Sequence, residues 1–275
     1  MSKVPISVVI ITRNVEDYIR DCLESVKWAD EIIICDNFST DNTKTIASEY
    51  TDKILTRAWD MEGKIRNFAY SHAKNNWILS LDPDERATPE LKKELEKIFA
   101  HNNIEFSGFF VQMKHYLGEH WIRWGGWYAG RLKIFRKDKF RYEEAEVHPR
   151  AFLEGKEGRL KADIIHLNYR DFSQCIEKTN IQSTLEAKKW LRDKRKMNIF
   201  IAFWRAGDRF LRMFLRKKGY REGFLGFMMA YISSLYQILS YAKYYEMKKQ
   251  LRVGNTSTMS SKTMGHKDKN INKSG

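Results

Sequence analysis

The chain has 275 residues, of which 43% are hydrophobic and 31% are charged, a composition typical of a globular protein large enough to bury a core. Its three cysteines form no closely spaced pair, which argues against a disulfide framework or a cysteine zinc site and favours a reducing, cytoplasmic compartment. The net charge of +14 is uneven, because residues 188–275 hold 21 basic and 5 acidic side chains whereas residues 1–187 hold 28 and 30.

The first hundred residues predict alternating strands and helices. Short apolar runs at 6–11, 31–35, 53–55 and 77–81 are separated by segments with apolar residues three and four positions apart. This pattern predicts repeated strand–helix–strand units and a parallel sheet covered on both faces. The first run leads straight into polar residues without a small-residue cleavage site, so we interpret it as a buried strand and not as a signal peptide.

Two of the expected helices carry capping signals. Asn14 is expected to cap a helix that follows the first strand. A second helix is expected over 88–100, with Thr88 as its N-cap and Pro89 at its first position. The inner face predicted for the first helix is formed by Val15, Ile19, Cys22, Leu23 and Val26.

Residues 104–170 are rich in aromatic and β-prone side chains. We expect mixed or antiparallel strands that extend the first sheet, with loops that form an acceptor pocket. The cluster Trp121, Trp124 and Trp127 has two open interpretations, since these rings can stack on sugars or pack in the core.

Residues 175–250 are predicted to be helical. From 200 to 216 an apolar stripe lies opposite a basic one, which is typical of an amphipathic helix at a membrane surface. The apolar stripe comprises Phe200, Phe203, Trp204, Gly207, Phe210, Leu211 and Phe214. The basic stripe comprises Arg205, Arg209, Arg212 and Arg216.

An uncharged run covers residues 223–242. It has about the ~20-residue length of a membrane span but is only weakly apolar, so a membrane-surface or re-entrant hairpin is favoured over a true span or a docked helix pair. Residues 254–275 show no periodicity and are expected to be disordered.

Polar residues follow three of the expected strands, at 12–14, 36–43 and 82–85. In parallel sheets such loops meet at one edge, where ligands bind. Asp82 and Asp84, on the turn that leaves a strand, supply the oxygen ligands preferred by Mg²⁺ or Mn²⁺. Taken alone, this pair of carboxylates is more typical of a solvated turn than of a metal site.

The segments SVVIITRN, EIIICDNFSTDNT and GKIRNFAYSHAKNNWILSLDPDE resemble, in order and spacing, the inverting glycosyltransferases of family 2. Within them, CLESVKWADEIIICDNFSTDNT and YLGEHWIRWGGWYAGRLKIFRK are most similar to the lipopolysaccharide core biosynthesis group, the WaaE/KdtX-like proteins. The resemblance covers residues 6–170. It implies a GT-A fold of the α/β class: a Rossmann-like, mostly parallel sheet flanked by helices, with a C-terminal helical extension that associates with a membrane.

The expected organisation follows from this resemblance. Residues 1–170 form the catalytic domain, with a nucleotide-sugar-binding half at 1–100 and an acceptor-binding half at 101–170. A basic, amphipathic helical region at 171–253 follows, and then the disordered tail.

The resemblance also implies donor-binding residues. Thr12, Asn14 and Asp36 match positions that contact the base and ribose, although Asp36 is also a plausible turn residue. Arg66 and Asn67 match a basic–Asn pair near the nucleotide. Lys64 lies beside them, where a solvated helix charge is the open alternative.

The metal ligands implied by the resemblance are Asp84, Asp82 and His166. Asp84 would bind a divalent cation, Mn²⁺ or Mg²⁺, and Asp82 would face the ribose or a metal-bound water. His166 matches a recurrent histidine that adds a ligand in some GT-A enzymes, while a structural histidine on an apolar strand is the alternative.

An inverting transfer needs a carboxylate base. The segment 141–150 supplies Glu144 and Glu146, which are favoured equally over Glu143 and His148. Relatives carry a glutamate directly after this histidine, where the present chain has Pro149, so the base is left open between the two favoured residues.

We therefore expect a metal-dependent enzyme that moves a hexose from a nucleotide sugar, a UDP-sugar by preference, to a lipid-linked or lipopolysaccharide-core saccharide. It is expected to be cytoplasmic and peripherally bound to the anionic inner face of the cytoplasmic membrane. The alternatives are a polyprenyl-phosphate or capsule glycosyltransferase and an inert membrane scaffold. Nucleic-acid binding is not expected, because the basic residues are interrupted by an apolar stripe suited to contact lipid.

Overall fold

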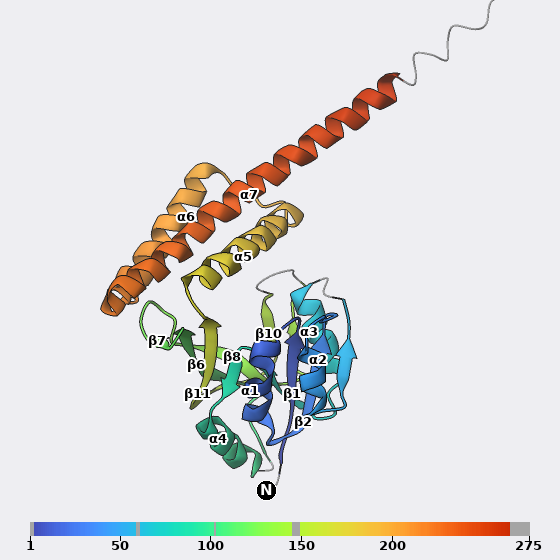
Figure 1. The fold of residues 1–275 in the computed structure, drawn as a ribbon, viewed down its shortest axis with the longest axis vertical. Coiled ribbons are helices and arrows are strands. Elements are labelled where there is room, and N and C mark those ends of the chain that lie inside the picture. The colour runs from blue at the N-terminus through green and yellow to red at the C-terminus, as the bar shows by residue number, and fades with distance from the viewer. Residues whose placement is uncertain (1–2, 59–60, 102, 145–148, 265–275) are drawn as a thin grey trace, which may run out of the picture.

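The computed structural model describes residues 3–58, 61–101, 103–144 and 149–264, with side chains described to residue 251. An α/β body comes first along the chain, and three long helices lie together beyond one end of it (Figure 1). This arrangement agrees with the prediction that a helical extension follows the α/β part of the chain.

Within the described residues, nine strands form one sheet in the order β3-β2-β1-β4-β8-β6-β11-β5, with β7 paired to β6. The strands of this sheet are β1 Val4–Thr12, β2 Ala29–Asp36, β3 Ile54–Thr56, β4 Trp77–Leu81, β5 Glu85–Ala87, β6 Gly108–Leu117, β7 His120–Ile122, β8 Ala129–Arg136 and β11 Glu157–Tyr169. A separate antiparallel pair is formed by β9 Phe140–Tyr142 and β10 Ala151–Leu153.

The sheet confirms the predicted parallel first half and its mixed extension. Strand β1 pairs in parallel with both β2 and β4, and β2 pairs in parallel with β3. Strand β8 then runs antiparallel between β4 and β6.

Helices cover both faces of this sheet, as continuous apolar strands require. They are α1 Glu16–Val26, α2 Thr43–Ser48, α3 Glu62–Ser71 and α4 Pro89–Phe99. In β1, Val8 and Ile10 pack into the core under α1 and α4, whereas Val9 and Ile11 pack into the core under α3. The alternation follows from the two-residue period of a strand.

The capping predictions had different outcomes. Thr88 caps α4 as expected, because its hydroxyl accepts a hydrogen bond from the Leu91 N–H at 3.3 Å and Pro89 is the first helical residue. The expected cap at Asn14 was wrong: α1 begins at Glu16 with Val15 in the N-cap position. The Asn14 side chain instead accepts a hydrogen bond from the Thr40 N–H, which ties two loops together.

Strand β11 connects distant parts of the chain. It pairs in parallel with β6 on one side and antiparallel with the short β5 on the other. In the second pairing, His166 lies opposite Glu85. A histidine from the second half of the α/β body is thereby placed beside the acidic turn of the first half.

The three long helices are α5 Phe172–Arg192, α6 Ile199–Leu211 and α7 Gly223–Met264, with a π-helical turn Arg212–Arg216 and a 3-10 turn Gly219–Glu222 between the last two. Helix α7 packs against both α5 and α6 and continues past them (Figure 1). Disorder was expected from residue 254, but α7 continues to Met264. A helix that has already formed propagates through a segment without proline. Residues 265–275 lie outside the described residues.

Helix α6 presents its two stripes in opposite directions. Most of the apolar stripe is exposed to solvent, with 81% of Phe200 and 72% of Trp204 accessible, whereas Phe210 and Phe214 are half-buried against Phe227. Arg205 and Arg209, on the other stripe, turn inward and line a cleft between the helices and the sheet. Of the four arginines in the basic stripe, these two therefore lie in the cleft, where α6 packs against α7.

One described helix is long and apolar enough to cross a membrane by length and composition. It covers Gly219–Leu251, with a mean hydropathy of 1.2 in its most apolar window and 39% of that window buried. Helices in the cores of soluble proteins meet the same criteria, so this observation is weak evidence for a span.

The three cysteines are buried in three different packing regions. Cys22 lies in the core under α1, Cys35 in the core under α3, and Cys175 where α5 and α7 meet the sheet. All three are free thiols.

Candidate active site

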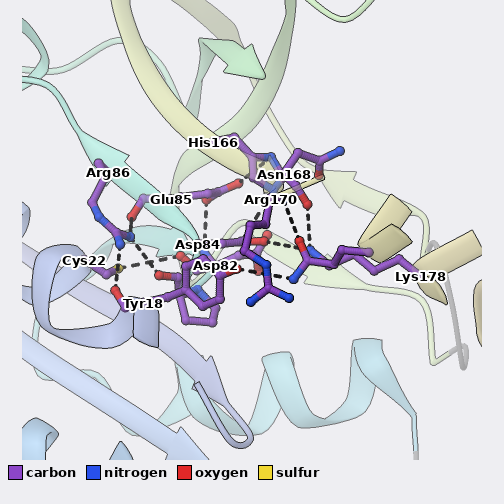
Figure 2. A network of polar contacts seen from close by, with 12 residues as sticks. Tyr18, Cys22, Asp82, Asp84, Glu85, Arg86, His166, Asn168, Arg170 and Lys178 are labelled. Carbon is purple, nitrogen blue, oxygen red and sulfur yellow. Dashed lines mark hydrogen bonds and ion pairs between the residues drawn. The ribbon is translucent and has the colours of Figure 1, made fainter. Parts of the chain in front are cut away.

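An acidic turn connects β4 to β5 and comprises residues 82–84. The buried strand β4 delivers the chain to this turn, and the Glu85 N–H donates to the Asp82 carbonyl at 2.9 Å, which closes it. Figure 2 shows the carboxylates of Asp82, Asp84 and Glu85 gathered here beside His166 and Lys178.

Two cations bind the carboxylate of Asp82. Arg66 of α3 donates from Nη2 to Oδ1 at 2.7 Å, and Lys133 of β8 donates from Nζ to Oδ2 at 3.3 Å. Burial alone would raise the pKa of Asp82, but the Arg66 guanidinium and the Lys133 ammonium outweigh burial and hold that pKa well below its usual range. Asp82 is therefore a fixed negative charge.

Glu85 is the most deeply buried carboxylate of the site, with 1% of the residue exposed. Its Oε2 accepts hydrogen bonds from the Lys133 ammonium at 2.7 Å and from the Asp82 N–H at 3.0 Å. Burial raises the pKa of Glu85, although Lys133 opposes this effect. Glu85 and Lys133 thus form the floor of the site.

Asp84 and His166 face each other across the turn. Nε2 of His166 lies 3.4 Å from Oδ1 of Asp84, and Nζ of Lys178 lies 3.3 Å from Oδ2. Burial disfavours the charged form of each residue, but the hydrogen bond and the attraction between the two outweigh burial. The pKa of Asp84 is therefore lowered and that of His166 is raised. Nδ1 of His166 is buried without a hydrogen-bond partner among the described residues.

A second histidine, His115 of β6, lies behind His166 with the two ring centroids 4.8 Å apart. Burial, together with the charge on His166, lowers the pKa of His115 to about 3, so this ring is neutral at physiological pH. Its other ring contact is Trp127, at a centroid distance of 5.4 Å.

The side chains around the acidic turn offer a partial set of ligands for a divalent cation. In the part of the chain that the structure describes, no three His, Cys, Asp or Glu side chains form a complete metal site. Asp84 and His166 are nevertheless adjacent, whereas Asp82 is engaged by Arg66 and Lys133. Because Mg²⁺ is commonly held by one or two carboxylates together with substrate phosphates and water, this incomplete set fits a cation that arrives with a nucleotide.

Asp82, Glu85, Lys133 and His166 line a cleft of about 890 Å³, whereas Asp84 and Lys178 lie just outside its lining. One end contains Arg66, Asp82, Lys133 and His166, and the other end lies under α5, α6 and α7. Trp127 lines the cleft, whereas Trp121 and Trp124 do not, so among the three tryptophans it is the one placed to meet a ligand here.

Thr12, Asn14 and Asp36 are brought together, as predicted, at the ends of β1 and β2. The Thr12 hydroxyl donates to Asp36 at 2.9 Å, and the Ser39 N–H donates to the same carboxylate at 2.9 Å. Asp36 is fully buried, and none of the three residues lines the 890 Å³ cleft. In this structure their polar atoms hold two loops against each other.

The remaining predicted donor residues lie on α3, with different surroundings. Lys64 is half-buried and lies outside the cleft lining, while Arg66 points into the site. Asn67 makes two hydrogen bonds to the backbone of Tyr142, each 2.9 Å long. Asn67 therefore anchors β9 and the segment that follows it.

That segment contains the predicted base. Glu144 is exposed and lies outside the cleft lining. Glu146 and His148 lie outside the described residues. The carbonyl of Glu143 lies so close to Gly63 that a Cβ at this position would overlap it, which shows that the segment starts against the N-terminus of α3, one turn from Arg66.

The sequence motifs gave no role to Lys133, Lys178 or Glu85. Lys178 lies in no quoted motif, and Lys133 lies in a quoted segment whose resemblance implied no role for it. Lys133 follows from the antiparallel pairing of β8 with β4, and Lys178 from the packing of α5 beside the acidic turn. Long-range pairings of this kind leave no local signal in the sequence.

A sheet with a parallel first half, and carboxylates at a strand end beside a cleft, is typical of α/β enzymes of the nucleotide-binding type. The family model for glycosyl transferase family 2 matches residues 7–152. The chain therefore belongs to this family, is a glycosyltransferase, and has the GT-A fold implied by the sequence resemblance.

Two curated relatives match most of the chain. The lipopolysaccharide core biosynthesis glycosyltransferase LpsC of Rhizobium meliloti is 28% identical, over 89% of this chain and 93% of LpsC. An uncharacterised glycosyltransferase of Rickettsia typhi is 27% identical, over 90% and 89% of the two chains. Among solved structures, Staphylococcus aureus TarS in complex with UDP is similar at 16% identity, with 92% of each chain covered and a TM-score of 0.47.

Proposed function

We propose that the protein transfers a hexose from a UDP-sugar, with inversion, to a lipid-linked saccharide of the lipopolysaccharide core. The observation that carries this proposal is the acidic turn of a family 2 glycosyltransferase at the floor of a cleft, with Asp84 facing His166. The similarity to LpsC over most of both chains supports the acceptor class.

The donor is proposed to bind at the end of the cleft that contains the acidic turn. The base and ribose are then contacted by Thr12, Asn14 and Asp36, after the loops that follow β1 and β2 rearrange around the nucleotide. Arg66, already ion-paired to Asp82, is close enough to the turn to meet the diphosphate, and Lys64 and Asn67 support it from the same helix.

A divalent cation, Mg²⁺ or Mn²⁺, is proposed to be held by Asp84 and His166, with Asp82 beside it. When bound, it stabilises the charge that accumulates on the departing diphosphate. Lys133 favours the ionised forms of Asp82 and Glu85 and holds both in place, since it contacts both carboxylates.

The base is proposed to be Glu144 or Glu146, which removes the proton from the acceptor hydroxyl as its oxygen attacks the anomeric carbon. The bond to the diphosphate breaks on the opposite face in the same displacement, so the configuration inverts. The anchoring of Tyr142 by Asn67 supports this assignment, because it ties the start of the segment to the helix that carries Arg66.

The reaction is proposed to take place at the inner face of the cytoplasmic membrane. The exposed apolar stripe of α6 and the basic residues Arg216, Lys217 and Lys218 after it support peripheral association with an anionic surface.

The test is release of UDP from a panel of UDP-sugars by the purified protein, with and without Mn²⁺ or Mg²⁺. We expect metal-dependent release from one donor. Asp84→Asn should lower that release at least ~100-fold, a loss typical of removing one electrostatic contact to a developing charge. Glu90→Gln, an exposed acidic residue of α4, is the matched control and should retain full activity. Undiminished release by the Asp84 variant would refute the assignment.

A further inference from the structure

The cleft continues from the acidic turn to the three C-terminal helices, and its far end is basic. Helix α6 contributes Arg205 and Arg209 to the lining, one helical turn apart on the same face. Helix α5 contributes Glu186, and α7 contributes Tyr236 and Gln237. Glu186 is the one carboxylate that the described residues of these three helices add to the lining.

The two arginines are poorly neutralised. Arg205 donates from Nε to the Gln237 amide oxygen at 2.9 Å, a neutral partner. No side-chain hydrogen bond or ion pair joins the Arg209 guanidinium to a described residue. Glu186 attracts both arginines, but its carboxylate accepts a hydrogen bond from the Trp190 indole N–H at 2.6 Å. Positive charge therefore dominates this end of the cleft.

This arrangement is unfavourable without a ligand. Like charges four residues apart on a helix repel each other, and half-burial weakens their hydration. Burial lowers the pKa of Arg209, and the neighbouring Arg212 adds to this effect. The Tyr236 hydroxyl, also in this wall, is buried without a hydrogen-bond partner among the described residues. Hydrogen-bond donors that lack acceptors and lie close together, as here, are suited to bind an anion.

We propose that Arg205, Arg209 and Tyr236 bind a phosphate or carboxylate group of the acceptor saccharide. This inference rests on the proposed function, since it places the donor diphosphate at the other end of the cleft, beside Arg66 and Lys133. The opposite, apolar stripe of α6 is exposed, so one helix would contact the lipid surface on one side and the anionic saccharide on the other. The substrate class is thereby narrowed to acceptors that carry an anionic group.

The test uses glucose 6-phosphate as the probe and glucose as its uncharged counterpart. Each is titrated calorimetrically into the full-length protein saturated with UDP and Mg²⁺. We expect glucose 6-phosphate to bind at least tenfold more tightly than glucose, and R209Q to remove this preference. R209K should retain part of it, because a lysine keeps the charge but lacks the planar fork.

The matched control is R212Q. Arg212 follows on the same stretch of chain but pairs with Asp208 at 2.9 Å and lies outside the cleft lining, so its loss removes an equal charge without affecting the probe. UDP affinity should be the same in all variants, which also shows that each is folded.

Three results would overturn the proposal. The first is equal binding of glucose 6-phosphate by the wild type and R209Q. The second is a weaker affinity of R209Q for UDP, which would assign Arg209 to the donor. The third is loss of binding to phosphatidylglycerol vesicles by R209Q with glucose 6-phosphate binding intact, which would assign it to a lipid headgroup. Failure of the wild type to bind UDP would instead contradict the proposed function, and the probe would still compare wild type with R209Q in the free protein.

Discussion

Lys133 allows two buried carboxylates, Asp82 and Glu85, to lie side by side. Its ammonium contacts both, and only 11% of its side chain is exposed. We expect Lys133→Met to destabilise the protein by roughly 3–5 kcal/mol, because removing one member of a buried ionic group leaves the others uncompensated. Urea unfolding measures this change.

Two further variants make that measurement specific. Lys139→Met removes an exposed lysine whose nearest carboxylate is 3.9 Å away and should change stability by no more than about 0.5 kcal/mol. Adding Glu85→Gln to Lys133→Met should recover part of the loss, since one buried charge is then absent. Equal stability of the two lysine variants would contradict the assigned role of Lys133.

Glu31 gives a pH-dependent contribution to stability, away from the acidic turn. Burial alone would raise its pKa, but hydrogen bonds from Lys53, Ser7 and the Lys74 N–H lower it below the ordinary value of 4.5. A depressed folded-state pKa stabilises the protein above pH 4.5, and this contribution is lost as the pH falls through the folded-state value.

Glu31→Gln should therefore lower the free energy of unfolding by about 1–2 kcal/mol at pH 7. The difference from wild type should shrink as the pH is lowered below 4.5, where the wild-type carboxylate gains its proton. Urea titrations at a series of pH values test this expectation. A difference that stays constant down to acid denaturation would argue against the charge as its cause.

At the same scale, the sequence predicted the acidic turn, Arg66 and His166 at the site, since each lies in a contiguous motif. It did not predict that Asn67 would bind backbone, because the partner strand is 75 residues away. The sequence also did not predict that Arg205 and Arg209 point inward, into the cleft. A helical pattern defines two faces, but only tertiary packing decides which face turns inward.

At the scale of single elements, Thr88 ties helix α4 to the sheet. Its hydroxyl accepts from the Leu91 N–H and donates to the Asp163 carbonyl at 2.8 Å. We expect Thr88→Ala to cost about 1 kcal/mol, as for other N-caps. Thr88→Ser keeps the hydroxyl and should cost less than half as much. Both values come from chemical denaturation, and equal losses would indicate that the methyl group matters more than the cap.

The elements that could be predicted are those with local signals. The inner face of α1 is as expected at Ile19, Cys22, Leu23 and Val26, because a helix repeats its pattern within a few turns. Strand β5 was not predicted, since three residues that become a strand only by pairing with β11 carry no periodicity. Helix α7 runs past the expected boundary at 254 because composition alone does not end a helix.

At the scale of the whole molecule, the exposed stripe of α6 is the surface proposed to contact the membrane. We expect the double variant Phe203→Ser, Trp204→Ser to reduce binding to phosphatidylglycerol vesicles at least ~10-fold, because these rings are 56% and 72% exposed and insert at an interface. Vesicle sedimentation measures this. Phe38→Ser, in the donor half and 59% exposed, is the control. If both variants sediment like wild type, α6 is not the membrane contact.

The placement of the three cysteines gives the chain an internal set of probes for partial opening. Each thiol reports one layer: Cys22 the sheet under α1, Cys35 the sheet under α3, and Cys175 the junction with the C-terminal helices. Cys35 is fully buried, so labelling reagents reach it only when its surroundings open, and burial also raises its pKa to about 11. If Cys175 is labelled faster than the other two, the C-terminal helices detach as a unit while the α/β body stays folded, so the two parts open on different timescales.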